Sequence, residues 1–276
     1  MDKIKNFIIS HKNNPKRIIK SSLILLLIIY IIIGLINTLD VTHYTYKSSK
    51  LPKDFNNFKI VQISDLHTKS FGKDNSKLLK EIKSFSPDII AITGDLINDN
   101  LKDLDKLSVF LNELPDVAPT YFICGNHDMP SWEEYLELVQ ILNNYNIQVI
   151  DNQKIPLTQG NSTINLCGLF SYTESYAVEV DTDEFNLLLY HYADHFDITK
   201  SLGYDLILAG HTHGGIIRLP LIGGLLDTDM SLFSRYDNGV YTSEECTLIS
   251  SRGLGTSLIP RFYNDSELVC ITLQSE

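Results

Sequence analysis

The chain has 276 residues, of which 43% are hydrophobic and 21% are charged, and its formal net charge is −11. This length and composition fit one sizeable globular domain with an appendage, or at most two small domains. The acidic balance disfavours nucleic acid as a partner, because a phosphate backbone repels a negatively charged surface.

The first part of the chain has the opposite charge. Residues 1–20 carry six basic side chains and a single acidic one, so their local charge is +5 and the remaining residues sum to −16. This split indicates that residues 1–20 are a separate basic tail.

An uncharged apolar run, SSLILLLIIYIIIGLINTL, occupies residues 21–39. At helical rise it spans roughly 28 Å, about the thickness of the hydrocarbon core of a bilayer. A buried core helix seldom runs this long without a polar face. A cleaved signal peptide would have a shorter apolar region followed by a small-residue cleavage site, whereas this run ends in Asn37, Thr38 and Leu39. We therefore predict an uncleaved transmembrane anchor.

The basic residues favour one orientation of this anchor. Six of them precede the apolar run, and three lysines between residues 47 and 53 follow it, diluted by acidic neighbours. The positive-inside rule then places the N-terminus in the cytoplasm and residue 40 onward outside it. We expect a single-pass protein of the cell membrane. Residues 40–57 are polar with little periodicity and should form a tether to a domain over residues 58–276.

From Phe58 onward, short apolar runs alternate with amphipathic stretches. The runs are rich in Ile, Val, Leu or aromatic residues, which is typical of buried strands. The amphipathic stretches 76–85, 101–114 and 132–144 place their apolar side chains on one helical face. This alternation predicts an α/β fold. The expected strands are 59–64, 88–93, 120–124, 147–150, 163–169, 186–190, 205–209, 247–250 and 268–273.

The four cysteines, Cys124, Cys167, Cys246 and Cys270, each lie in an apolar, strand-like run, and none belongs to a C-x-x-C pair. We interpret them as buried free thiols, with disulfides or metal ligation as the alternatives.

Clusters of Asp, Asn and His follow five of the expected strands. The carboxyl ends of strands in α/β sheets are where ligand sites assemble. Carboxylate, imidazole and amide groups together suit a divalent metal. The clusters are Ser64-Asp65-Leu66-His67, Thr93-Gly94-Asp95, Gly125-Asn126-His127-Asp128, His191, and Gly210-His211-Thr212-His213-Gly214-Gly215.

Taken one at a time, these residues have ordinary explanations. Asp65 and Asp95 could cap turns, and His191 could be a core histidine. As an ordered set they favour a metal site. Asp65 and His67 are two residues apart, so on a regular strand they would share one face.

In this order, D-x-H, G-D, G-N-H-D, a single His and G-H-x-H resemble the motifs of the calcineurin-like metallophosphoesterase superfamily. They span residues 59–215, and G-H-T-H-G-G is the most specific of them. The segments RLPL at 218–221 and SRGLGTS at 251–257 resemble a bacterial membrane-associated, YkuE-like branch. Ile216 departs from the Gln that is common in that branch, and the loop after His191 also differs, which leaves the rim and that loop in doubt.

The resemblance implies a four-layer αββα sandwich with two mixed sheets and a dinuclear metal site at the strand C-terminal ends, preceded by one N-terminal transmembrane helix. Two divalent ions, with Mn, Fe or Zn expected, would activate a hydroxide for attack on phosphorus. Asp95 would bridge them. One ion would be held by Asp65, His67, Asp95 and His213, and the other by Asp95, Asn126, His191 and His211.

The resemblance also gives His127 a catalytic role, either contacting the phosphate or protonating the leaving oxygen. Asp128 is expected to orient its ring. Arg252 and Arg261 either meet substrate anions or are ordinary salt-bridged residues.

The leading hypothesis is a hydrolase of phosphate monoesters or diesters at the membrane surface, acting on a phosphorylated small molecule or lipid. One alternative is a lipid-linked diphosphate hydrolase of the UDP-2,3-diacylglucosamine type, which an active site outside the cytoplasm would disfavour. A second alternative is a non-catalytic metal-binding scaffold, which the complete set of motif residues disfavours. No nucleic-acid partner is expected, and the N-terminal helix supplies the membrane contact.

Overall fold

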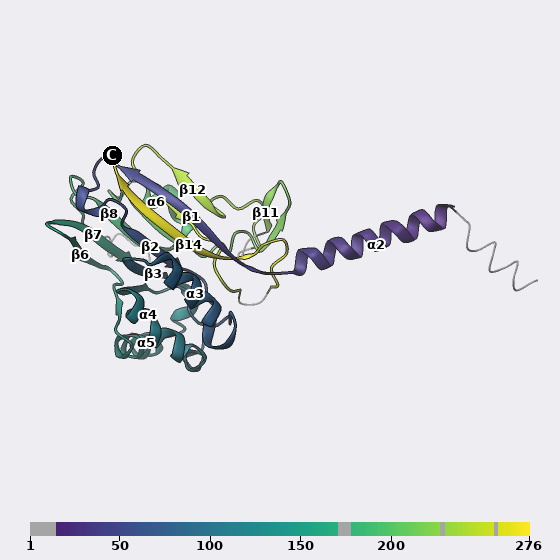
Figure 1. Ribbon diagram of the computed structural model, residues 1–276, viewed down its shortest axis with the longest axis horizontal. Helices are drawn as coiled ribbons and strands as arrows, with labels where there is room; N and C mark the ends of the chain where they lie inside the picture. Colours follow the sequence, from purple (N-terminus) through teal and green to yellow (C-terminus); the bar gives the residue numbers. More distant parts are fainter. Residues whose placement is uncertain (1–14, 171–177, 227–229, 257–258) are drawn as a thin grey trace, which may run out of the picture.

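The computed structural model describes residues 15–170, 178–226, 230–256 and 259–276. A six-stranded sheet lies at its centre, in the order β1-β14-β2-β3-β4-β5 (Figure 1). Strands β2 to β5 are parallel, while β14 is antiparallel to β2 and parallel to β1. The bounds are β1 (Leu39–Ser48), β2 (Lys59–Ile63), β3 (Ile89–Thr93), β4 (Thr120–Ile123), β5 (Ile147–Val149) and β14 (Ser266–Ser275).

A second six-stranded sheet packs against the first, in the order β12-β13-β9-β8-β7-β6. Its inner strands β13, β9, β8 and β7 are parallel, and the two edge strands are antiparallel to their neighbours. The bounds are β6 (Gln153–Gln159), β7 (Ser162–Leu169), β8 (Asn186–Tyr192), β9 (Leu206–Gly210), β12 (Gly239–Thr242) and β13 (Thr247–Ser250). A separate two-stranded ribbon consists of β10 (Ile217–Leu219) and β11 (Gly223–Leu226).

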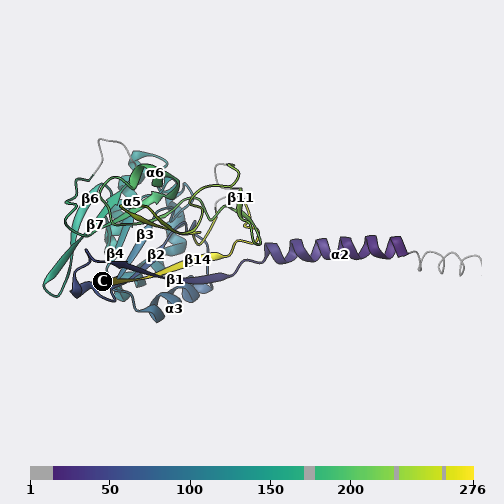
Figure 2. The same ribbon diagram turned by 90° about the horizontal axis from the view of Figure 1, so that it is seen from above.

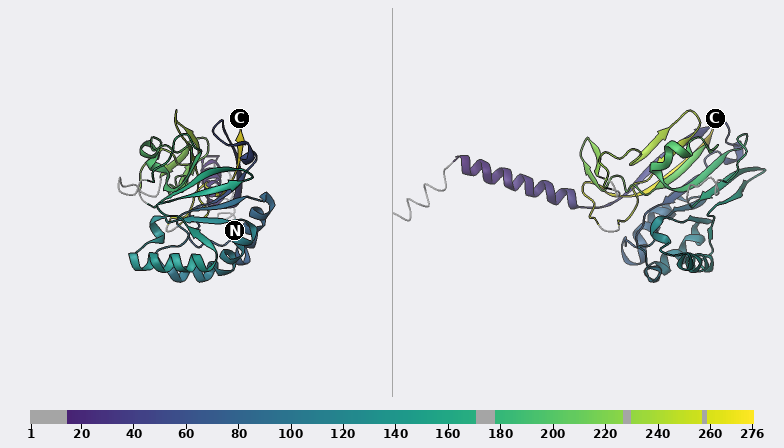
Figure 3. Two further views of the ribbon diagram at one scale, coloured as in Figure 1. Left: turned by 90° about the vertical axis from the view of Figure 1, so that its left-hand side faces the viewer. Right: turned by 180° about the vertical axis from the view of Figure 1, so that it is seen from behind.

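Helices cover the outer face of the first sheet. They are α3 (Ser76–Phe85), α4 (Ser108–Val117) and α5 (Trp132–Asn144), with a 3₁₀ segment, Leu101–Leu107, leading into α4. The end-on view in Figure 3 shows them as a layer beneath the sheets. In the part of the chain that the structure describes, the outer face of the second sheet carries only a short helix, α6 (Phe196–Thr199), and loops.

Three apolar clusters separate the layers, because successive side chains on a strand point to opposite faces. In β8, Leu187 and Leu189 face the core between the two sheets, whereas Leu188 and Tyr190 face the outer core near α6. A third core lies between the first sheet and helices α3, α4 and α5. The expected fold, a mixed α/β sandwich with two mixed sheets, is confirmed, although its fourth layer is thin.

Every strand expected from the sequence is present within two residues of its predicted ends, and the helices expected at 76–85 and 132–144 are confirmed. The stretch expected as one helix over 101–114 is instead a 3₁₀ segment followed by α4. The four cysteines are buried and unpaired, as expected. Strands β6, β10, β11 and β12 were not expected, because they bury few side chains and so lack an apolar pattern.

The expectation of a tether over residues 40–57 is wrong. Half of this segment is strand β1, which pairs with β14 along its whole length. The rest of the segment is also part of the domain, since Leu51 and Phe55 are buried in the core between the sheets. Polar residues alternate with half-buried ones in β1, as expected for an edge strand, and this polarity disguised it in the sequence.

The N-terminal helix α2 (Pro15–Leu35) projects from the domain (Figure 2). Only three residues separate it from β1. Its last turns are bonded to the domain: the amide of Tyr263 donates to Gly34 O at 2.7 Å, and the Tyr263 hydroxyl donates to Tyr30 O at 2.9 Å. Within the described residues, α2 is the one helix long and apolar enough to cross a membrane, a property that signal sequences share.

Replacing Tyr46 in β1 with serine should destabilise the domain by about 2 kcal/mol, because it removes a half-buried ring from the core. That ring lies 6.0 Å from the ring of Phe185, and its hydroxyl donates to Asp205 O at 3.1 Å. Urea unfolding of the Tyr46→Ser and Thr45→Ser variants measures the effect. Thr45 is exposed, so its variant should stay within about 0.5 kcal/mol of the parent. Equal stability of both variants would restore the tether interpretation.

Candidate metal centre

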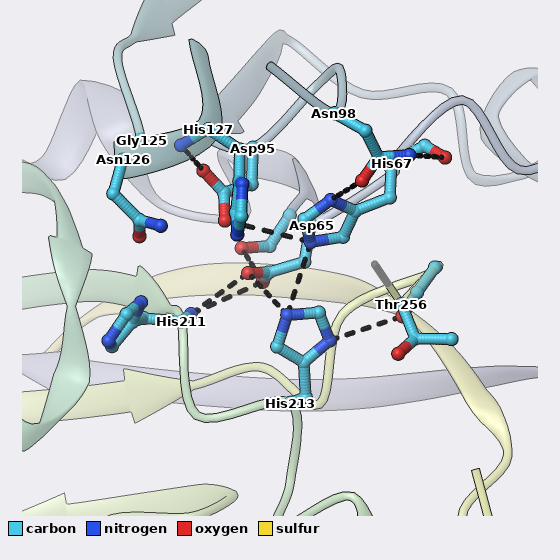
Figure 4. Close-up of polar contacts among 12 residues, drawn as sticks. Asp65, His67, Asp95, Asn98, Gly125, Asn126, His127, His211, His213 and Thr256 are labelled. Carbon is cyan, nitrogen blue, oxygen red and sulfur yellow. Dashed lines mark hydrogen bonds and ion pairs between the residues drawn. The ribbon is translucent and has the colours of Figure 1, made fainter. Parts of the chain in front are cut away.

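Four loops and the end of one strand bring the polar clusters together at one edge of the two sheets. The loops follow β2, β3 and β4 in the first sheet and β9 in the second, and His191 lies at the C-terminal end of β8 itself. Figure 4 shows the side chains pointing toward a common centre. The seven residues expected as metal ligands, Asp65, His67, Asp95, Asn126, His191, His211 and His213, therefore come from both sheets.

Left-handed backbone conformations aim most of these side chains. Asp65, His67, Asp95, His211 and His213 all have φ between 48° and 72°. An L-residue pays roughly 1–2 kcal/mol for this conformation, so five in one site mark a strained, functional backbone. Their spacing suggested regular strands, but these five residues instead occupy tight turns just beyond the strand ends.

Two glycines let these turns approach each other. A Cβ atom on Gly125 would lie 2.2 Å from Oδ1 of Asp95. A Cβ on Gly94, whose φ is +89°, would lie 2.7 Å from Nδ1 of His191. Neither position has room for a side chain, which explains the glycine in both the G-D and the G-N-H-D motifs.

Asp65, His67, Asp95 and His213 form one buried group whose ligand atoms all lie within 4.8 Å of one another. Nε2 of His67 is 3.2 Å from Nε2 of His213 and 3.6 Å from Oδ2 of Asp95. Nε2 of His213 is 3.6 Å from Oδ1 of Asp65. This is the set that the resemblance implied for the first metal ion.

Asp95, His191 and His211 form a second group, of three residues, whose ligand atoms also lie within 4.8 Å of one another. Nε2 of His191 lies 3.3 Å from Oδ2 of Asp95, 3.3 Å from Nδ1 of His211 and 3.1 Å from Oδ1 of Asn126. Asp95 therefore belongs to both groups, as a bridging ligand must.

The chemistry of these atoms fits a cation. Nδ1 of His191 lies 2.9 Å from the carbonyl oxygen of Thr93, and Nδ1 of His67 lies 2.7 Å from Oδ1 of Asn98. Both Nδ1 atoms must therefore carry the proton, which leaves the Nε2 lone pairs pointing at the centre. Oδ2 of Asp95 is buried there and accepts no hydrogen bond from the described residues. Lone pairs that face one another in a buried site fit divalent metal ions.

The local electrostatics favour positive charge at the centre. Burial alone would lower the pKa of His191, but the Asp95 carboxylate outweighs it and raises that pKa to about 10. Burial raises the pKa of Asp95, but His191 and then His67 outweigh it, so the net pKa is depressed. Burial lowers the pKa of His213 to about 3, so that imidazole stays neutral and able to ligate. The Asp95 carboxylate thus attracts positive charge to the centre.

His127 stands beside the first group with its side chain partly exposed. Its amide donates to Oδ1 of Asp95 at 2.8 Å, and its ring lies 5.2 Å from that of His67. Nδ1 of His127 is 2.9 Å from Oδ2 of Asp99, and the Asp99 amide donates to His127 O at 3.0 Å. These contacts hold the ring at the mouth of the site, next to the exposed Asn126.

The expectation that Asp128 orients His127 is wrong. Oδ1 of Asp128 accepts from the amides of Leu96 and Ile97, and Oδ2 accepts from Gly125. Asp128 instead ties the Asp95 turn to the turn that carries His127. Burial, followed by repulsion from Asp95, raises the pKa of its carboxyl to about 7.

Asn98 and Asp99 are site residues that the sequence did not reveal. They hold the rings of His67 and His127, and they lie three and four residues beyond Asp95 in the same loop. The signal available in the sequence was a pair of adjacent polar residues a few positions after a predicted ligand.

The two arginines considered for substrate contact are structural. Arg261 is buried and donates to the carbonyl oxygens of Gly255, His213 and Arg252. Arg252 pairs with Asp40 at 2.7 Å and with Glu267 at 3.2 Å.

Removing divalent metal should destabilise the chain even when no substrate is present. Two ions bound well above their dissociation constants stabilise the folded state, so chelation should lower the melting temperature by about 10 °C. Differential scanning fluorimetry with and without a chelator measures this shift. The isosteric Asp95→Asn variant should lose the response, whereas His127→Ala should keep it. A melting temperature that is indifferent to chelation in the parent chain would contradict a metal centre.

Comparison with known proteins agrees with this site. The family model described as calcineurin-like phosphoesterase matches residues 58–215, which include all seven expected ligands. YkuE of Bacillus subtilis (strain 168), an uncharacterised metallophosphoesterase, is 28% identical over 249 residues, covering 86% of each chain. Phosphodiesterase YaeI of Escherichia coli (strain K12) is 31% identical over 209 residues, covering 72% of this chain and 76% of that protein.

A further relative is the uncharacterised metallophosphoesterase Cj0846 of Campylobacter jejuni, which is 29% identical over 270 residues, covering 94% of this chain and 70% of that protein. The expected likeness to YkuE is confirmed. Because the family match covers the same loops that assemble the buried Asp and His cluster, the chain belongs to the calcineurin-like phosphoesterases and is a dinuclear-metal-dependent phosphoesterase.

Proposed function

We propose that the chain hydrolyses phosphate monoesters or diesters at a membrane surface, with Asp65, His67, Asp95 and His213 holding one metal ion and Asp95, Asn126, His191 and His211 holding the other. The observation that carries the proposal is the pair of buried ligand groups that share Asp95. Two divalent ions bound there supply Lewis-acid chemistry, lowering the pKa of water and neutralising charge on the phosphoryl group.

The residues of the chain supply the remaining steps. Asn126, at the exposed mouth, marks the side from which the phosphate approaches. The His127 ring stands on that side, where it can donate a proton to the leaving oxygen. Asp99 acts as a positioning residue, since its carboxylate fixes the ring through Nδ1 and leaves Nε2 free for the substrate.

The position of the centre favours a lipid substrate over a soluble one. Asn264 donates through its side chain to His213 O at 2.7 Å and accepts through its backbone oxygen from Asn37 at 2.8 Å. Asn264 thus bridges the backbone of a proposed ligand to Asn37, two residues beyond the end of α2. The headgroup layer of a bilayer is roughly 5–8 Å thick on each side, so the metal centre would lie close to headgroup phosphates. We therefore favour a phosphorylated lipid over a soluble ester.

The charge pattern supports a site outside the cytoplasm. Strand β1 carries Lys47 away from the end of α2, by roughly 25 Å at the rise of a strand. The lysines that follow the helix in sequence are thus distant from the membrane surface, whereas the basic residues at the N-terminal end lie before the helix or in its first turns, as Lys16, Arg17 and Lys20 do. This orientation disfavours a cytoplasmic nucleotide-linked lipid as the substrate.

Full-length chain loaded with Mn²⁺ should hydrolyse simple phosphate esters, and His127→Ala should lower kcat by about 10²-fold or more for an alkyl ester. The loss should be much smaller for a p-nitrophenyl ester, because that leaving group needs no proton. Metal content measured by mass spectrometry should not change. His43→Ala, an exposed histidine on β1, is the matched control.

Two outcomes would contradict this assignment. If the metal-loaded parent chain hydrolyses none of the esters, the proposed function is wrong. If His127→Ala loses the same factor for both leaving groups, His127 is not the acid.

The orientation can be tested separately on intact cells. Protease added to spheroplasts should degrade the domain over residues 58–276, because the proposed topology exposes it outside the cytoplasm. Immunoblotting against the C-terminal strand reports the cleavage, with a cytoplasmic protein as the control for lysis. Protection of the domain until the membrane is permeabilised would reverse the orientation.

A further inference from the structure

The ribbon of β10 and β11 is extended by a third segment. Leu226 bridges to Leu232, and the Phe233 amide donates to Leu225 O at 3.1 Å. We call residues 217–226 and 230–233 the apolar ribbon. It belongs to neither of the two large sheets.

The apolar ribbon exposes bulky side chains to a degree that folding does not explain. Leu221, at its tip, is 107% exposed, and Ile222, Met230, Leu232 and Phe233 are each at least 63% exposed. Among the residues that the structure describes, half of the large exposed hydrophobic residues outside the N-terminal helical region lie in this small segment. A contiguous exposed apolar patch of this kind marks a binding surface.

The turn at the tip points to the same conclusion. Ile222 donates its amide to Leu219 O at 3.1 Å, which closes a turn with Pro220 and Leu221 at its centre. Leu221 has a φ of 70°, a conformation that turns normally assign to Gly or Asn. A leucine held in that conformation with its whole side chain in solvent contributes nothing to the packing of the domain.

The apolar ribbon is hydrogen-bonded to the segment that packs against α2. Arg218 donates its amide to Phe262 O at 2.9 Å, and Ile217 bridges to Phe262. The rings of Phe262 and Tyr263 lie 6.1 and 4.9 Å from the ring of Tyr30, one turn before the end of α2. Figures 1 and 2 show β11 at the end of the domain from which α2 leaves. Tyrosines are enriched at the interface between a bilayer and water.

We infer that the apolar ribbon lies in the lipid surface beside α2 and forms a second membrane contact. The inference rests on the membrane anchoring in the proposed function. The occupant is lipid, because the apolar ribbon is bonded to Phe262, which packs on α2, and lies at the end of the domain from which α2 leaves, so a bilayer that surrounds α2 reaches the ribbon. Alternate side chains of a β-ribbon point to the same face, so an apolar face of the ribbon can enter the lipid surface to a shallow depth.

This lipid contact sets the distance of the metal centre from the membrane surface. Gly215, two residues beyond His213, would contact Gly224 of β11 through any added Cβ, so the ligand loop and the ribbon are in direct contact. Lipid on the ribbon therefore holds the same loop that carries two of the proposed metal ligands, and keeps the mouth of the site at headgroup level.

The test is lipid quenching of a fluorophore on the full-length chain. Leu221→Cys can be labelled selectively, because the four native cysteines are buried. In vesicles of phosphatidylcholine brominated on its acyl chains, mixed with phosphatidylglycerol, the label at residue 221 should lose roughly half or more of its fluorescence relative to unbrominated vesicles, as expected for a shallowly inserted side chain. Val109→Cys on α4, also apolar and 48% exposed, is the matched control and should not be quenched.

A second variant separates the lipid contact from the fold. Asn accepts positive φ, so Leu221→Asn should keep the turn and the melting temperature while removing one apolar anchor. In this background, the quenching of a label at Ile222→Cys by brominated lipid should then be about tenfold smaller.

Three outcomes would overturn the inference. If alkaline extraction releases the chain from the vesicles, both the anchor and the ribbon contact fail. If the chain is retained, hydrolyses soluble esters and shows no quenching at residue 221, the ribbon contact alone fails. If Leu221→Cys chains instead form a disulfide with each other, the ribbon is an interface between copies.

Discussion

The structure depends on one electrostatic constraint, which is the convergence of acceptor atoms on the Asp95 carboxylate. Two imidazole lone pairs and a second carboxylate face a buried oxygen that no described hydrogen-bond donor satisfies. Such a site is unfavourable unless positive charge occupies it. The glycines, the tight turns and the buried Asp128 can all be understood as what is needed to hold these atoms in place.

The strain in the ligand turns is compensated by bonds between the loops. The amide of Asp65 donates to Gly94 O, and the amide of His67 donates to Asp95 O. The His211 amide donates to the Asp65 carboxylate at 3.1 Å, which ties the second sheet to the first. Asp65, His67 and His211 are thus each held in the left-handed conformation by a bond to a neighbouring loop.

Much of this arrangement could be predicted from the sequence, because polar residues directly after apolar strands are unusual and their order was informative. The partner of His127 could not be predicted from the sequence. Asp128 is adjacent in sequence, but its side chain points back to the backbone, and Asp99 reaches the ring from another loop. Likewise β1 was hidden by its alternating polar residues, since an edge strand needs only one half-buried face. The ligand roles of the seven residues stay predictions, although their convergence is what those roles require.

The pairing of the last strand has a consequence for biosynthesis. β14 lies between β1 and β2, so the first strand to emerge after the helix has no neighbour until the last strand is made. The parallel strands β2 to β5 can pair as soon as they are synthesised, but the sheet closes only after residues 266–275 have been made. A ribosome that stalls early would leave β1 as an open edge beside the membrane, where proteases that survey nascent chains could recognise it.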